Sequence, residues 1–263
     1  MTPRGVVSPS ATLRTYRPLK AVLIGLTFVT GMVDAITYLG LGHVFAGNMT
    51  GNVVLLGFAL VGADQISVGG SLVSLAAFLV GATLGGRLAR ELEKTQHRWI
   101  VTSLGLESVL LGAAMLSAHF LPTTGDHVTV SLLALAMGMR TATARRIAIP
   151  DLATTVLTLT LTGLAAETQV PGSAPGVVGR RLAAVAAMLL GAATGALVLR
   201  GGGEAAAIGV ALGLVLLGTA GYLATLRSTR PLAPHSEAVR STFTDDRAGT
   251  SADGSDPVVS GAE

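Results

Sequence analysis

The stretch A-V-L-I-G-L-T-F-V-T-G-M-V-D-A-I-T-Y-L-G, from Ala21 to Gly40, decides the fold class of this 263-residue chain. It contains one formally charged residue, Asp34, and between Ala21 and Gly86 the only other one is Asp64. A helix needs roughly 20 mostly apolar residues to cross the hydrocarbon core of a bilayer. A soluble fold would have almost nothing with which to cover its surface. We therefore expect an all-α membrane protein with several spans.

The composition of the whole chain supports this expectation. Charged residues make up 13% of the chain and mean hydropathy is +0.65, whereas soluble globular proteins have about 25% charged residues. The absence of Cys excludes disulfide scaffolds, thiolate metal sites and thiol catalysis. A sequence pI near 9.8 is explained by basic loops at an anionic membrane face. With 4% aromatic residues and no nucleic-acid motif, we expect a lipid bilayer and no nucleic acid as partner.

Eight apolar windows follow one another, at residues 21–39, 51–62, 68–88, 99–121, 128–144, 152–166, 181–199 and 205–226. The two short windows, 51–62 and 152–166, are typical of re-entrant or buried segments. If all eight crossed, eight of the 18 Lys and Arg residues would face outside: Arg87, Arg90, Lys94, Arg98, Arg140, Arg145, Arg146 and Arg200. If the short windows return to the side from which they came, only Arg200 does.

The positive-inside rule favours the second arrangement. It predicts six transmembrane helices plus two short re-entrant elements in a bacterial inner membrane, with both termini in the cytoplasm. Residues 1–20 would form a basic cytoplasmic N-terminal tail, 21–226 the polytopic transmembrane domain, and 227–263 a polar, disordered cytoplasmic tail.

The transmembrane domain contains an internal repeat. The sequence F-L-V-G-A-T-L-G-G-R-L-A-R from residue 78 resembles M-L-L-G-A-A-T-G-A-L-V-L-R from residue 188. Three positions match at an offset of 110: Gly81 with Gly191, Gly85 with Gly195, and Arg90 with Arg200. G-M-V-D-A at 31–35 matches G-M-R-T-A at 138–142 at an offset of 107. The halves, about 21–121 and 128–226, would start on opposite sides of the membrane, an inverted repeat as in many secondary transporters.

Two blocks carry a resemblance to a known family. G-M-V-D-A-I-T-Y-L-G-L-G-H-V-F-A-G-N-M-T-G-N-V-V-L-L-G-F-A-L, residues 31–60, resembles the signature of the bacterial YoaK family of integral membrane proteins. A-M-G-M-R-T-A-T-A-R-R-I-A-I-P-D-L-A-T-T-V-L-T-L-T-L-T-G-L, residues 136–164, is similar to its second block. Relatives tend to carry an amide pair where this chain has Arg140 and Thr141, and Gly in place of Leu159. The family's function is unknown, so the resemblance implies location and topology only.

The turn into the first short element holds Asn48, Thr50 and Asn52. Asn and Thr side chains can cap the unpaired N–H groups that begin a helix. A half-helix N-terminus at membrane depth is also where transporters bind substrates or ions. These residues are therefore candidates for a substrate path, with a purely structural cap as the alternative.

The second short element offers a similar pattern. Asp151 can cap the helix that follows Pro150. Thr155, Thr158 and Thr162 recur on one helix face and could line a polar path. Alternatively, the Thr hydroxyls bond back to carbonyls of their own helix.

Asp34 and Glu107 are carboxylates deep within expected spans. Such residues are usually paired, protonated or functional. Arg140 is the one candidate cation at comparable depth, so an Asp34–Arg140 ion pair is one hypothesis. The alternative is that Arg140 extends to the cytoplasmic face and that Glu107 bonds to Ser or Thr of a neighbouring span.

These features favour a small-solute or ion transporter or permease, in which Asp34 would carry a coupling proton. The alternative is a non-transporting membrane protein, either a channel-like pore or a structural partner in a membrane complex. We expect no enzyme, cofactor or metal, because no catalytic motif is present and His43, His119 and His127 lack metal-ligand spacing. The two G-x-x-x-G pairs suit close helix contacts inside the bundle or at the face of a homodimer.

Overall fold

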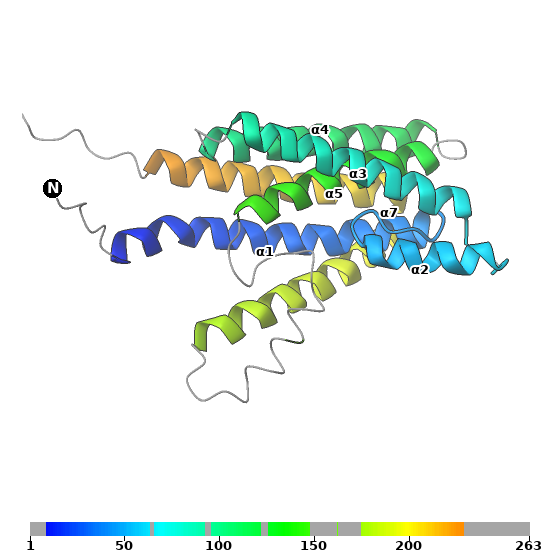
Figure 1. Ribbon diagram of the computed structural model, residues 1–263, viewed down its shortest axis with the longest axis horizontal. Coiled ribbons are helices and arrows are strands. Elements are labelled where there is room, and N and C mark those ends of the chain that lie inside the picture. The colour runs from blue at the N-terminus through cyan, green and yellow to red at the C-terminus, as the bar shows by residue number, and fades with distance from the viewer. Residues whose placement is uncertain are drawn as a thin grey trace, which may run out of the picture. The chain divides into compact units, whose positions relative to one another are not determined.

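A computed structural model describes residues 9–63, 66–92, 96–121, 126–147, 162 and 175–228. Within these ranges the chain forms six helices (Figure 1): α1 Pro9–Gly40, α2 Met49–Leu60, α3 Val68–Glu91, α4 Gln96–Phe120, α5 Asp126–Ile147 and α7 Pro175–Ser228. Helix α1 begins 12 residues before the apolar window at residue 21, so helix extends into the expected N-terminal tail. Helix α7 bends sharply at Gly203, whose φ of 74° and ψ of −176° are not helical.

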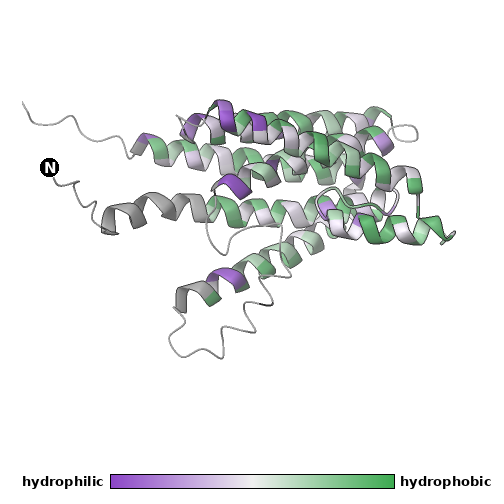
Figure 2. Cartoon of the chain, viewed as in Figure 1, coloured by the Kyte–Doolittle hydropathy of each residue, from purple (hydrophilic) through white to green (hydrophobic). Residues whose placement is uncertain are grey.

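Several helices of the described part have the length and composition of membrane spans. Four segments are long and apolar enough to cross a bilayer: Ala21–Gly40, Val68–Glu91, His97–Phe120 and Val178–Arg227. Large apolar side chains lie exposed on them, among them Leu79, Val109, Leu189 and Leu217. Hydrophobic residues dominate the helices in Figure 2 and hydrophilic residues gather toward several helix ends. The described residues are thus helical, as predicted, and four of their segments are long and apolar enough to cross a membrane.

Glycines bring two pairs of helices unusually close together. On α3, a methyl group at Gly81 would lie 2.8 Å from the carbonyl carbon of Leu135 on α5. On α7, a methyl group at Gly191 would lie 2.8 Å from the carbonyl carbon of Phe28 on α1. No real Cβ approaches so closely, so only glycine fits at either place. These glycines therefore make contacts within the chain itself.

The order of the glycine contacts gives the direction of the helices. Gly81 faces Leu135 and Gly85, four residues later, faces Met139, so α3 and α5 run parallel. In the same way Gly191 faces Phe28 and Gly195 faces Met32, so α1 runs parallel to the first half of α7.

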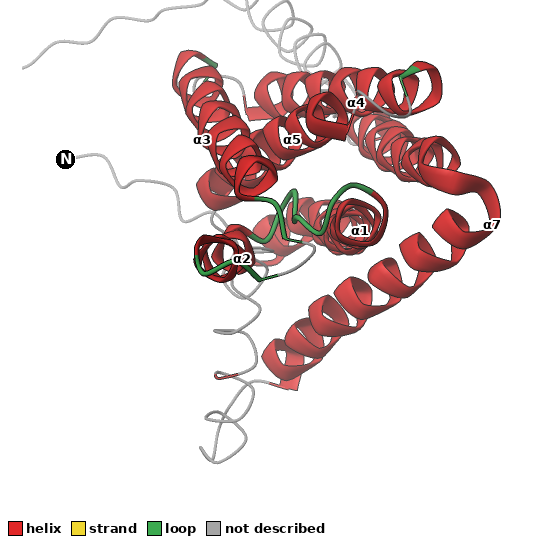
Figure 3. Cartoon of the chain, turned by 90° about the vertical axis from the view of Figure 1, so that its right-hand side faces the viewer, coloured by secondary structure: helices red, strands yellow, loops and turns green. Residues whose placement is uncertain are grey.

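The core lies where α1, α4, α5 and α7 meet. Its fully buried side chains include Met32, Ile36, Leu111, Leu133 and Ile208. Viewed end on, α3, α5 and α4 form a row, α1 and α2 lie beside that row, and the two arms of α7 diverge from their bend (Figure 3). This arrangement places polar residues of α1, α4 and α5 opposite one another inside the bundle.

Candidate functional site

The segment between α1 and α2 is held by the Asn52 side chain. Asn52 is completely buried, and its amide bonds to both backbone groups of Phe45: Oδ1 accepts from the N–H at 2.8 Å and Nδ2 donates to the carbonyl at 2.6 Å. The Ser74 hydroxyl of α3 donates to the same carbonyl at 2.6 Å. Asn48 is the N-cap of α2 and accepts from the N–H of Gly51 at 3.3 Å. The capping prediction for Asn48 is therefore confirmed.

The same segment returns along α1 to Asp34. The N–H of Gly47 donates to Asp34 Oδ1 at 2.7 Å. Asp34 precedes the end of α1 at Gly40 by six residues, about 9 Å along a helix axis. The chain thus passes the end of α1, turns back into the bundle, and then starts α2. Thr50, one of the expected path residues, is exposed on α2.

Asp34 itself is a buried carboxylate that faces the backbone N–H groups of Ala46, Gly47 and Asn48. The residue is 5% exposed, and its second oxygen, Oδ2, has no hydrogen-bond partner among the described residues. A buried polar atom without a partner is uncommon in folded proteins and calls for an explanation.

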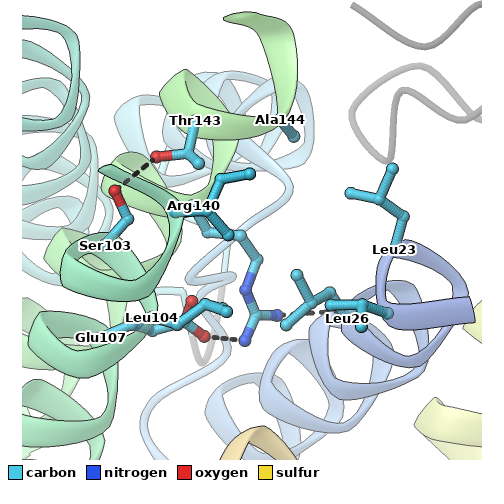
Figure 4. A pocket seen from close by; sticks show the side chains of 10 residues that line it. Leu23, Leu26, Ser103, Leu104, Glu107, Arg140, Thr143 and Ala144 are labelled. Carbon is cyan, nitrogen blue, oxygen red and sulfur yellow. Dashed lines mark hydrogen bonds and ion pairs between the residues drawn. The ribbon is translucent and has the colours of Figure 1, made fainter. Parts of the chain in front are cut away.

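Arg140 is buried and pairs with Glu107 (Figure 4). Among the described residues no ion pair joins it to Asp34. Arg140 is 5% exposed and Glu107 2%. The other terminal nitrogen of the guanidinium, Nη1, donates to the Leu26 carbonyl and to the Thr30 hydroxyl, both at 3.0 Å. Both predictions for Arg140 are wrong: its side chain does not extend to the cytoplasmic face, and its ion-pair partner in the described part of the chain is Glu107 and not Asp34. Glu107 bonds to a guanidinium instead of a neighbouring hydroxyl, because α4 and α5 bring the two side chains together.

The ion pair and Asp34 belong to one buried polar region. Thr30 bonds to Arg140 through its hydroxyl, and its methyl group lies beside Gly47, the residue that bonds to Asp34. Thr30 and Asp34 are one helical turn apart on α1. The region therefore contains two carboxylates and one guanidinium inside the bundle.

A small cavity adjoins the ion pair. Its volume is about 20 Å³, room for about one water molecule. The polar residues of its wall are Ser103, Glu107, Arg140 and Thr143, and the rest of the wall is apolar. Thr143 donates a hydrogen bond to Ser103 at 3.3 Å, which joins α5 to α4 beside the ion pair.

A larger cavity of about 340 Å³ lies next to the small one. Residues of α1, α4 and the second half of α7 line it, and the two cavities share the walls formed by Val22, Leu26 and Leu104. Tyr222, on its wall, bonds through its hydroxyl to Nδ1 of His97 at 2.9 Å.

Sequence reasoning missed Thr30, Ser74 and Ser103. Two of them had a signal, since Thr30 precedes Asp34 by four residues and Ser103 precedes Glu107 by four, which places each pair on one helix face. Ser74 had no such signal.

Of the expected residues of the second short element, only Thr162 is described. Asp151, Thr155 and Thr158 lie outside the described residues, and Thr162 is exposed. Within the described ranges no three His, Asp or Glu side chains are grouped to hold a metal ion.

Comparison with known proteins identifies the family. The family DUF1275, described as a protein of unknown function, matches residues 22–221. The chain is also similar to the UPF0700 transmembrane protein YoaK of Bacillus subtilis (strain 168), with 36% identity over 154 residues that cover 58% of this chain and 68% of that protein. No solved structure matches the chain. Because the family model matches most of the chain, the chain belongs to the DUF1275 family of transmembrane proteins.

Proposed function

We propose that this protein is a small secondary transporter of the bacterial inner membrane, in which Asp34, together with Glu107, carries a coupling proton. The observation that carries the proposal is the buried Asp34 carboxylate, whose Oδ2 has no hydrogen-bond partner in the described part of the chain, beside a segment that turns back into the bundle. An ionised carboxylate near the centre of a bilayer costs at least about 2.5 kcal/mol, and such residues commonly mark ion and proton pathways.

Charge balance supports a bound proton. Asp34 and Glu107 bring two negative charges, and Arg140 brings one positive charge. If both carboxylates were ionised, the buried region would carry one net negative charge. One bound proton neutralises it, and loss of that proton on one side of the membrane gives the change in charge that coupled transport requires.

The six-span arrangement adds two spans to the four apolar segments described above. Helix α7 would cross twice, because its 54 residues are broken at Gly203. Helix α5, with 22 residues, is long enough for the sixth span despite its buried Arg140. Helix α2, with 12 residues, would be the helical part of a re-entrant element. For this arrangement, the distribution of Lys and Arg residues predicts that both termini lie in the cytoplasm.

The helix contacts support an inverted repeat. The contacts Gly81–Leu135 and Gly191–Phe28 are related by offsets of 110 and 107 residues with the order of the partners exchanged. A further pair of contacts, Gly112 with Leu212 and Gly209 with Met115, follows the same rule. An offset of 97 residues relates Gly112 to Gly209 and Met115 to Leu212. In inverted-repeat transporters one half rocks against the other around a central site. The buried polar region occupies such a place, between α1 of the first half and α5 of the second.

The proposal is tested by flux in proteoliposomes. The full chain is reconstituted with a pH dye inside, and small carboxylates, amino acids, sugars and inorganic ions are added one at a time. We expect at least one solute to enter together with protons, Asp34→Asn to abolish the proton movement, and Glu91→Gln, an exposed control at the end of α3, to leave it unchanged.

If no solute moves although the protein is folded, the non-transporting alternative is correct. If Asp34→Asn leaves proton-coupled flux intact, Asp34 does not carry the proton.

A further inference from the structure

We infer that Arg140 binds the carboxylate of a small monocarboxylate, of the size of acetate, in exchange for the carboxylate of Glu107. This inference rests on the proposed transport function and names the substrate class. It starts from the incomplete pairing of the Arg140 side chain.

The guanidinium of Arg140 has one edge left for a ligand. Nη1 is occupied by Leu26 and Thr30, and Nη2 donates to Glu107. Nε is buried and has no hydrogen-bond partner among the described residues. A carboxylate can accept from Nε and Nη2 together in the planar, two-bond geometry that arginine favours. A ligand carboxylate in the place of Glu107 could satisfy both nitrogens, whereas Glu107 satisfies only Nη2.

The small cavity sets the size of the ligand. Its volume of about 20 Å³ holds about one water-sized group, and a methyl group is of similar size. Apolar side chains of α1 and α4, including Leu23 and Leu104, form most of its wall. With the ligand carboxylate in the place of the Glu107 carboxylate, the methyl group of acetate would fill the cavity. Formate would leave it empty, and butyrate would be too long for it.

The displaced Glu107 carboxylate must be neutralised. The charged groups of this region among the described residues are Glu107 on α4, Arg140 on α5 and Asp34 on α1. Once the ligand carboxylate has replaced the Glu107 carboxylate beside Arg140, Glu107 accepts a proton. The anion and the proton therefore bind together without a change in net charge. The larger adjoining cavity, separated only by Val22, Leu26 and Leu104, is the route by which the ligand would approach.

Trp99 provides a direct measurement of binding. It is the only tryptophan of the chain, is 6% exposed, and precedes Ile100, which lines the small cavity. The purified full chain in detergent is titrated with sodium acetate, with sodium chloride added to keep the ionic strength constant. We expect a saturable change in Trp fluorescence with acetate, a weaker response with formate, and none with butyrate or with acetamide, the neutral analogue. Trp99→Phe identifies the source of the signal.

Three variants separate this site from a merely structural ion pair. Glu107→Gln removes the competing carboxylate, so acetate should bind about tenfold to a hundredfold more tightly and without dependence on pH. The double variant Arg140→Gln/Glu107→Gln, which leaves no unpaired charge, should lose binding. Arg145→Gln, an exposed control five residues away on α5, should bind as the native chain does.

The outcomes also distinguish this inference from the transport function. If Glu107→Gln weakens binding, if the double variant still binds, or if acetamide acts like acetate, the inference is wrong. If another solute is transported and acetate does not bind, the substrate class is wrong although the transport function stands. Binding of acetate as described, without flux of any solute, supports the carboxylate site and overturns transport.

Discussion

Replacing Gly81 or Gly191 with alanine should destabilise the bundle to the same extent, although the two glycines lie in different helices. A methyl group at either position would lie 2.8 Å from a backbone carbonyl carbon of the partner helix. Ordinary contact begins at 3.4 Å, so each pair of helices would have to separate by at least 0.6 Å (3.4 minus 2.8). A backbone carbonyl cannot rotate away as the end of a flexible side chain can.

Two opposing effects decide how far the free energy of unfolding falls in these two variants. Overpacking of this kind costs about 1 to 3 kcal/mol, and a backbone obstacle favours the upper end of that range. Replacing a helical glycine with alanine contributes about 1 kcal/mol in the other direction. The net loss should be about 2 kcal/mol, which lowers Tm by about 4 to 8 °C for a domain of this size. Gly86→Ala is the matched control, because a methyl group there has nothing within 4 Å. It should raise Tm by about 2 to 4 °C.

The assay is thermal unfolding of the purified variants in one detergent. Opposite shifts for Gly81→Ala and Gly86→Ala, which are five residues apart on α3, would support the close contact between α3 and α5. Shifts in the same direction would show that this contact is wrong. Clearly unequal losses for Gly81→Ala and Gly191→Ala would refute the equivalence of the two halves.

Three further predictions concern the ion pair, the turn and the topology. Glu107→Gln or Arg140→Gln alone should lower the free energy of unfolding by about 3 to 5 kcal/mol and the double variant by far less; additive losses in thermal unfolding would contradict the buried pair. Asn52→Ala should cost about 1 to 3 kcal/mol, because it leaves the partly buried N–H of Phe45 without its partner; an unchanged Tm would show that the turn does not depend on this amide. In the natural cysteine-free background, Gly202→Cys should react in whole cells with a thiol reagent that does not cross membranes, and Arg98→Cys should not. Labelling of the second variant would disprove the six-span arrangement.

The sequence was sufficient for the features that depend on local composition. The apolar stretch at residues 21–40 identified a membrane span, because the hydrophobic effect acts on each segment separately. Asp34 and Glu107 stood out for the same reason, since a carboxylate within an apolar run is visible without knowledge of its neighbours. The match between Gly81 and Gly191 was also visible, as was the capping position of Asn48.

Only the tertiary structure decided which residues meet. The partner of Arg140 depends on α4 and α5 lying side by side with Glu107 at the right height, and no pattern along the chain encodes that register. The role of Asn52 likewise depends on where Phe45 is placed by the turn. A buried guanidinium must find its carboxylate and hydroxyl acceptors among the side chains that packing brings within reach. That physical requirement makes Glu107 its partner, while Asp34 keeps one oxygen without a hydrogen bond from any residue that the structure describes.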